Sequence, residues 1–456
     1  MITLDDKKAA FAACTAASFL TPLMASSVNL ALPTIIREFA MDALTLSWVA
    51  TSFLLAAAMF LVPFGRLADI YGRKRIFVYG MFLFTLFSFL CGFASSGSML
   101  IALRALQGLG AAMIFATSMA ILTSAYPAAE RGRVLGFNVA AVYTGLSIGP
   151  FVGGMLTHLF GWRSIFYANA LIGSLVCILV MWKLKSEWAE SHGEQFDIPG
   201  SLIYTVSLTF LMIGFSKLPG MTGTWAVLAG VGGLVAFVAW ERRTSKPLLD
   251  ISLFAKNIVF GFSNLAALIN YSATSAVTFL ISLFLQYIKG LDPQHAGFIL
   301  VAQPLMMAVF SPLAGRLSDS VEPRIVASVG MGIICVMLGL LAFVGSETSL
   351  VLLTVYLLLL GFGFALFSSP NTNAVMSSVE RRWYGVASAT LGTMRLTGQM
   401  LSMGIVMLIF AVTMGATRIT PEYYVAFLQS MQIAFMVFSV LCIIGVFASL
   451  ARGKVR

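Results

Sequence analysis

The sequence predicts an all-α polytopic membrane protein with fourteen transmembrane helices. Of its 456 residues, 59% are hydrophobic and only 10% are charged, and the mean hydropathy is +0.94. Soluble domains carry roughly 25% charged residues, and one aqueous core cannot bury so much apolar surface. Lipid solvates such surface directly, at roughly 20 apolar residues per helical crossing. A water-soluble protein is therefore excluded.

Apolar runs bounded by charges or by glycine and proline turns mark the expected spans. The segments between them are short, which leaves no room for a soluble catalytic domain or an appended ATPase. No GxxxxGK[ST] phosphate loop occurs, so any work is expected to be driven by a gradient. The fourteen runs are 9–33, 45–64, 76–95, 99–124, 134–157, 164–182, 198–217, 223–240, 258–285, 294–315, 325–344, 349–372, 384–411 and 427–450.

The distribution of Lys and Arg predicts the orientation in the membrane. With both termini on one side, that side collects 21 of the 28 basic residues, the other side five, and Arg104 and Arg395 lie within spans. Because cytoplasmic loops are enriched in basic residues, both termini are expected in the cytoplasm of a cell with a plasma (inner) membrane. The net charge of +10 then reflects orientation rather than nucleic-acid binding. The five scattered cysteines predict neither a metal site nor disulfides.

An internal repeat divides the chain. The segments Gly65–Asp69 (GRLAD) and Gly315–Asp319 (GRLSD) each end the second span of a six-span set. Such a duplication predicts two six-helix halves around a central cavity. The expected divisions are an N-terminal half at 1–183, a central two-helix insertion with flanking loops at 184–257, and a C-terminal half at 258–456.

The run GRLADIYGRKR, from Gly65 to Arg75, resembles the loop signature of the major facilitator superfamily. Glycines permit a tight turn between helices, and an aspartate at a helix end can pair with arginine. Ordinary cytoplasmic loop charges would explain the basic residues but not the Gly and Asp positions. The second copy lacks the basic run. The resemblance implies a conformational latch made of Gly65, Asp69, Gly72 and Arg73, with Gly315 and Asp319 in the second copy.

Two arginines within spans are candidates for coupling or substrate binding. Arg104 opens the run RALQGLG, which is similar to the family's second motif, and Arg395 lies close to Gln399 in the thirteenth span. A charge in hydrocarbon costs roughly 2.5–3.5 kcal/mol, so Arg104 is expected to face a cavity or a polar partner. A purely structural polar network is the alternative. Further polar candidates, each able instead to bond between helices, are Asn29, Gln107, Asn371 and Asn373.

The fifth span carries small residues at helical spacing, in the run GLSIGPFVGG. This run resembles the motif that separates antiporters from symporters in the superfamily. Small residues let a neighbouring helix approach closely, and a proline kinks the helix. A generic packing face is the alternative. The residues concerned are Gly145, Gly149, Pro150, Gly153 and Gly154.

Fourteen spans, the inserted pair and these motifs together resemble the drug:proton antiporter-2 family of multidrug exporters, over the whole chain. The resemblance implies a monomeric secondary transporter, not an enzyme and without a cofactor or metal. It would exchange small amphipathic compounds for protons by alternating access. Met24 stands where that family has aspartate, and no acidic residue lies in a predicted membrane core. The proton carrier is thus unassigned; His158 and His295, near outer span ends, are hypotheses because imidazoles titrate near neutral pH.

Other functions remain open at this point. The two intramembrane charges are both positive, so an organic-anion or metabolite transporter with Arg104 and Arg395 as counter-charges is the main alternative. Uniport and anion-linked exchange are compatible with the same residues. A membrane sensor or channel is disfavoured, because a duplicated latch suits a structure that closes on both sides.

Overall fold

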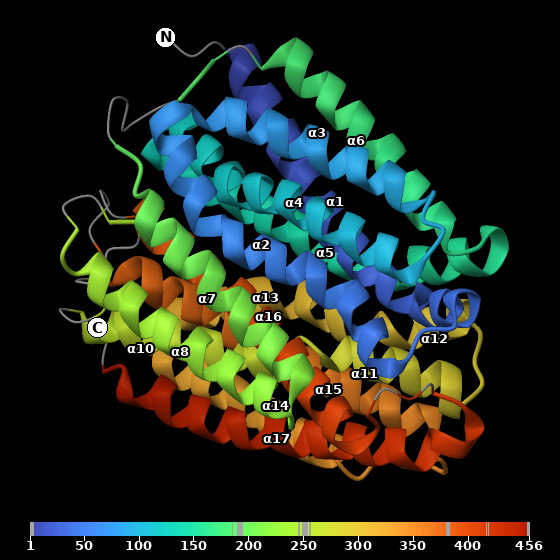
Figure 1. Ribbon diagram of the computed structural model, residues 1–456. Coiled ribbons are helices and arrows are strands. Elements are labelled where there is room, and N and C mark those ends of the chain that lie inside the picture. Colours follow the sequence, from blue (N-terminus) through green and yellow to red (C-terminus); the bar gives the residue numbers. More distant parts are fainter. Residues whose placement is uncertain are drawn as a thin grey trace.

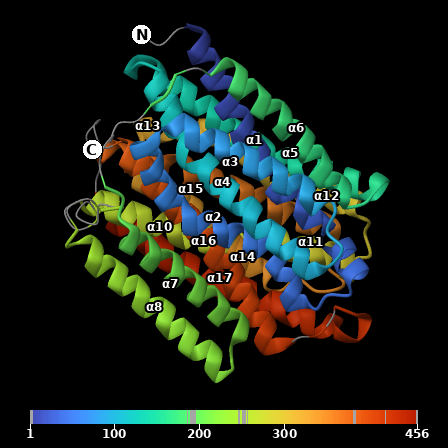
Figure 2. The same ribbon diagram turned by 45° about the horizontal axis from the view of Figure 1, so that its top comes forward.

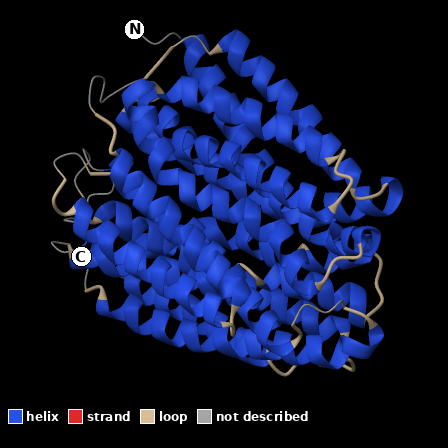
Figure 3. Ribbon diagram, viewed as in Figure 1, coloured by secondary structure: helices blue, strands red, loops and turns tan. Residues whose placement is uncertain are grey.

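The computed structural model describes residues 4–184, 186–188, 195–244, 247–248, 254, 257–379, 384–415, 417 and 419–453. Within these residues every regular element is helical (Figures 1 and 3). Fourteen of the helical segments are long and apolar enough to cross a membrane, which confirms the predicted all-α fold and the predicted number of spans.

Six single helices form the first set. Polar caps fix several of their starts: Asp42 accepts a hydrogen bond from the backbone N–H of Thr45 (2.6 Å), and Ser96 accepts one from Met99 (3.2 Å). The helices are α1 (Leu4–Phe39), α2 (Ala43–Tyr71), α3 (Arg73–Cys91), α4 (Gly97–Ala125), α5 (Ala128–Phe160) and α6 (Arg163–Lys183).

The second set also contributes six spans, but two of these are broken helices. The ninth span consists of α10 (Ile258–Thr274), α11 (Val277–Leu283) and the π-helix η1 (Phe284–Ile288). The tenth consists of α12 (Pro293–Leu300) and α13 (Ala302–Ser320). The remaining spans are α14 (Pro323–Leu341), α15 (Leu350–Ser377), α16 (Tyr384–Thr413) and α17 (Tyr424–Ala451), the last preceded by the short 3-10 helix η3 (Pro421–Tyr423).

An even number of crossings returns the chain to its starting side, and Figure 1 shows the N- and C-terminal ends of the chain on the same side of the helix bundle. This side, which holds Tyr71 and Lys183, is called the terminal face below. The other side, which holds Phe39 and Phe160, is called the opposite face.

The inserted pair, α7 (Ile198–Lys217) and α8 (Met221–Glu241), lies on the periphery of the bundle (Figure 2). Helix α7 covers the seam between α2 of the first set and α16 of the second, where Tyr204 and Met212 join a buried cluster with Ala58 and Met400. The Tyr204 hydroxyl donates to the carbonyl of Ala58 (3.2 Å). Helix α8 packs on α7 and is otherwise largely exposed. The pair therefore contacts both halves from outside.

Glycines set the closest approaches between helices. A Cβ built on Gly110 of α4 would lie 2.5 Å from the backbone nitrogen of Phe84 in α3, and one on Gly80 would lie 3.0 Å from the carbonyl of Gly110. Only a residue without a side chain permits this approach, which gains dispersion contacts where lipid supplies no hydrophobic driving force. Gly232, on the exposed helix α8, has no heavy atom within 4 Å of its would-be Cβ.

We expect Gly110→Ala and Gly232→Ala to have opposite effects. The first forces α3 and α4 apart and should cost about 1–3 kcal/mol, whereas the second only improves helix propensity and should be neutral or slightly stabilising. Thermal unfolding of the purified protein in detergent measures both. Equal melting temperatures for the two variants would contradict the packing described for α3 and α4.

Candidate functional site

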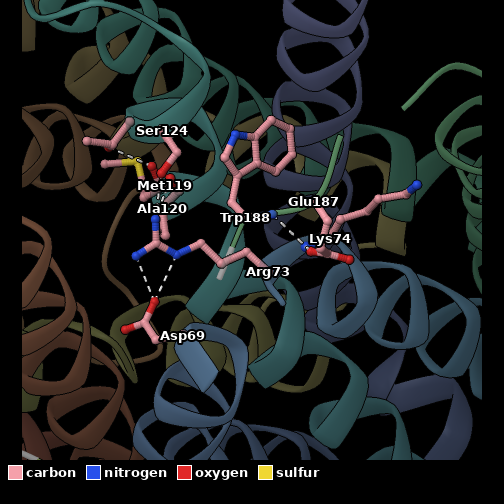
Figure 4. A network of polar contacts seen from close by, with 9 residues as sticks. Asp69, Arg73, Lys74, Met119, Ala120, Ser124, Glu187 and Trp188 are labelled. Atoms are coloured by element: carbon pink, nitrogen blue, oxygen red, sulfur yellow. Dashed lines mark hydrogen bonds and ion pairs between the residues drawn. The ribbon is translucent and has the colours of Figure 1, made fainter. Parts of the chain in front are cut away.

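The predicted latch residues lie at the terminal face, between α2 and α3. Asp69 pairs with Arg73, at 2.7 Å to Nη2 and 2.8 Å to Nε (Figure 4). The buried guanidinium also donates from Nη1 to the hydroxyl of Ser124 (2.6 Å), near the end of α4. Gly72 adopts φ +117°, a conformation that side chains disfavour. The latch therefore ties the α2–α3 turn to α4.

The linker that follows α6 also contacts this turn. The linker residues Glu187 and Trp188, which follow α6, accept hydrogen bonds from the first backbone N–H groups of α3: Arg73 to the Trp188 carbonyl and Lys74 to Glu187 Oε1, both 2.8 Å. Figure 4 shows both linker residues beside the latch. A Cβ on Gly72 would lie 2.6 Å from the Glu187 carboxyl carbon. Gly72 is thus required by its backbone conformation, and the end of the flexible Glu187 side chain lies against it.

The second copy of the latch is built differently. Gly315 lies in α13, where its carbonyl accepts a hydrogen bond from the Ser318 hydroxyl (2.7 Å). Asn373 of α15 donates to the same hydroxyl (2.9 Å). The side chain of Asp319 lies outside the residues whose side chains the structure describes. The predicted candidate Asn373 therefore lies beside the second latch copy.

Arg104 lies in a polar network inside the first helix set. It is 1% exposed, donates to the Val49 carbonyl of α2 (3.2 Å) and to the side chain of Gln107, and lies 4.3 Å from the ring centroid of Phe53. Gln107 in turn donates to the Ser88 hydroxyl of α3 (2.6 Å). Both side chains connect helices α2, α3 and α4, as the structural alternative for Arg104 requires.

Arg395 lies between the two helix sets. Its guanidinium, from α16, is 6.0 Å from the ring centroid of Phe115 in α4. Its Nε is buried and has no hydrogen-bond partner among the described residues. Nearby in the fold, the hydroxyls of Tyr143 (α5) and Ser368 (α15) meet at 2.7 Å across the same boundary. Of the two intramembrane arginines, Arg395 is the one at the interface between the sets.

Asn371 binds an arginine that the sequence analysis counted as a loop charge. Arg452, fully buried just after α17, donates to the Asn371 side chain (2.8 Å), to the Ser263 hydroxyl (3.3 Å) and to the Pro323 carbonyl (2.8 Å). Burial lowers the pKa of Arg452 to about 10, against the opposing charge of Glu322. Asn371 and Arg452 thus fasten α10, α14, α15 and α17 together at the terminal face.

The remaining polar candidates have few contacts. The side chains of Asn29 in α1 and Gln399 in α16 are partly exposed. The backbone carbonyl of Asn29 accepts a hydrogen bond from Ser282 of α11 (2.7 Å). A cavity of about 260 Å³ at the opposite face, lined by residues such as Arg37, Tyr287 and Tyr424, includes none of the predicted coupling residues.

The small residues of α5 face two different neighbours. Gly145, Gly149 and Gly153 pack against the backbone or serine side chains of α1, and Ser27 of α1 donates to the Gly149 carbonyl (2.8 Å). Gly154 instead packs on the Pro293 carbonyl of α12.

Pro150 shares this second contact, because a Cβ on Gly297 of α12 would lie 2.5 Å from the Pro150 carbonyl. The predicted antiporter motif therefore packs within the first set and also forms the contact between the sets at the opposite face. Gln286 of η1 adds a hydrogen bond to the Leu30 carbonyl of α1 (3.2 Å) on the same face.

Three residues of these networks were not predicted from the sequence: Glu187, Trp188 and Arg452. Each lies in a basic or polar segment beside a span, where loop charges are ordinary. Their partners are distant along the chain, 113 residues away for Glu187 and Lys74 and 81 for Arg452 and Asn371. No local pattern reports such contacts.

The fold and site define a membrane transporter of two six-helix halves with an inserted helix pair. The profile of the Major Facilitator Superfamily matches residues 14–403 and 263–455. The chain therefore belongs to the Major Facilitator Superfamily, and its fourteen spans fit the drug:proton antiporter-2 type.

Relatives with assigned names are transporters. The chain is 34% identical to the multidrug resistance protein Stp of Mycobacterium tuberculosis (strain CDC 1551 / Oshkosh), covering 88% of this chain and 75% of that protein. It is 32% identical to the riboflavin transporter RibZ of Clostridioides difficile (83% and 82% covered) and 32% identical to the cephamycin export protein CmcT of Amycolatopsis lactamdurans (85% and 81%). The predicted class, a transporter of the efflux type, is confirmed at this level.

A solved structure shares the fold. A bacterial homolog of the human lysosomal transporter Spinster, solved in an inward-facing and unoccupied conformation, superposes with a TM-score of 0.72 at 16% identity, covering 99% of this chain and 98% of that one. At this identity the likeness shows the fold alone.

Gly72→Ala and Glu187→Ala should be non-additive. Alanine at position 72 carries a backbone strain of about 1–3 kcal/mol and also collides with the Glu187 side chain. Removing that side chain relieves the collision but not the strain, so the double variant should lose less stability than the two single losses combined. Thermal unfolding of the three variants measures the coupling. Strict additivity would show that Glu187 does not press on Gly72.

Proposed function

We propose that the protein is a secondary active transporter that exports small amphipathic compounds in exchange for protons. The observation that carries the proposal is the packing of the antiporter motif: Gly154 and Pro150 of the first half meet Pro293 and Gly297 of the second. A contact of this kind closes one face and can separate when the halves rock, as alternating access requires. The named exporters among the relatives support the direction of transport.

The orientation and unit of function follow from the same proposal. The side of the membrane rich in Lys and Arg, which is the terminal face, lies in the cytoplasm of a plasma membrane. Both halves of the central interface come from one chain, so a monomer suffices. Asp69, Arg73 and Gly72 hold the cytoplasmic turn that changes its contacts as the halves move, while Gly315 and Asp319 act in the second half.

A second substrate class is favoured by Arg395. Nε of Arg395, which has no hydrogen-bond partner among the described residues, lies at the boundary between the halves beside Phe115, where an aromatic anion can stack and pair. Arg104 is not needed for this role because its guanidinium is already bound within one half. Asn29 and Gln399, which are partly exposed, are the neighbours on α1 and α16 that we propose for substrate contact or coupling.

Transport in liposomes tests the exchange. With an imposed proton gradient and a pH-sensitive dye inside, cationic, neutral and anionic amphiphiles are added in turn. We expect substrate-triggered proton movement that is absent from empty liposomes and reduced in Asp69→Asn. If no compound of any charge moves protons while labelled compounds still cross, proton exchange is wrong and uniport or anion-linked exchange takes its place.

Substitutions of Arg104 and Arg395 should have different effects, the first on stability and the second on substrate binding. Arg104→Gln removes charged hydrogen bonds from a buried network, which should cost about 1.5–3 kcal/mol of stability and lower the melting temperature. Arg395→Gln should leave the melting temperature unchanged and weaken binding of anionic amphiphiles about tenfold or more, the scale of a buried charged contact. Unchanged anion binding in Arg395→Gln would remove this substrate class.

A further inference from the structure

A histidine and a carboxylate meet across the two halves at the opposite face. Nδ1 of His158, in the last turn of α5, lies 3.9 Å from Oδ1 of Asp292. Asp292 also binds Nδ1 of His295 at 2.5 Å and caps α12 by accepting the backbone N–H groups of Gln294 and His295. Only the contact with His158 crosses between the halves.

The His158–Asp292 pair lies where it can affect closure of the opposite face. Asp292 directly precedes Pro293, and His158 lies one helical turn beyond Gly154, so the pair sits beside the glycine contact that joins α5 to α12. Opening the opposite face must separate Gly154 from Pro293, and that movement also separates His158 from Asp292. The strength of this pair therefore bears directly on the closed state.

Several other charges described at this face have partners of their own. Glu38 of α1 binds Arg163 of α6 (2.6 Å) and the indole of Trp162 (2.7 Å). Arg37 lies 5.9 Å from the ring of Tyr287.

Lys289, after η1, donates to the Ser346 carbonyl. Among the residues that the structure describes, the ion pairs of Asp292 are with His158 and His295. A change in the charge of His158 is thus felt first at Asp292.

We propose that His158 and Asp292 form a proton-binding site that favours closure of the opposite face when His158 is protonated. The proposal rests on the alternating-access function above and gives it a titratable group outside the membrane core. Although burial raises it, hydrogen bonds from the backbone and side chain of His295 lower the pKa of Asp292 overall, so this carboxylate stays negative while imidazoles titrate.

The direction of the effect follows from the charges. Protonated His158 attracts the Asp292 carboxylate and stabilises the closed state, and loss of that proton removes the gain. Protons from outside would thus close the outer face, which is the direction that exchange of an exported compound for protons requires. Since both side chains are partly exposed, the shift should not exceed about fivefold in the closed-to-open ratio.

Distance measurements between spin labels test the proposal without any substrate. Labels at Phe160→Cys and Phe343→Cys, two exposed positions on different halves at the opposite face, report its opening. The partly exposed Cys177 and Cys335 are replaced by serine in the full-length protein. Between pH 8.0 and 5.5 we expect the ratio of short-distance to long-distance populations to rise by up to about fivefold.

Variants distinguish the site from simple packing. His158→Gln should abolish the pH response, and His158→Lys should hold the short-distance population at both pH values. His192→Gln, which changes the third histidine, is the matched control and should respond like the unmodified chain. A pH response that survives in His158→Gln, or none in the unmodified chain, overturns the proposal. Failure of the liposome exchange with a normal pH response would instead reject only the transport function.

Discussion

Lipid offers no hydrogen bonds, and this constraint governs every polar group within the fourteen spans. Arg104 satisfies it by binding the Val49 carbonyl and Gln107 inside one half. Hydroxyls of serine and threonine satisfy it by returning to carbonyls one turn earlier, as Ser88 does with Phe84 (2.6 Å). Nε of Arg395 is one of several buried groups without a hydrogen-bond partner among the described residues, and its side chain lies at the boundary between the two halves. Arg452 also has an unpartnered Nε although its other nitrogens fasten helices, so it is the position of Arg395 between the halves that distinguishes it as a candidate to meet a ligand.

The same constraint explains which features were predictable from the sequence. Apolar runs must be long and continuous to cross lipid, so the fourteen spans could be recognised without any contact information. The latch motif could also be recognised from the sequence, because Gly72 and Asp69 are required by local geometry. For Arg104 the sequence predicted a polar partner but not which one. The contact between Gln107 and Ser88 forms only when helices α3 and α4 pack together.

Contacts between distant segments could not be predicted in this way. Glu187 looks like any acidic loop residue until α6 places it over Gly72, and Asp292 looks like an ordinary helix cap until α5 brings His158 beside it. The small residues of α5 were expected to face a neighbouring helix, yet Gly153 and Gly154 face different ones because adjacent residues point about 100° apart on a helix. One motif thus joins two interfaces, and a sequence motif read alone cannot show that division.

Arg452 has a practical consequence for truncation or tagging after α17. Its guanidinium is buried among α10, α14 and α15, only four residues before the last residue of the sequence. The final helix is therefore anchored by a residue that follows its apolar run. A fusion partner or purification tag has to begin beyond this anchor, and a shortened chain that ends at Ala451 would leave three helices without a shared donor.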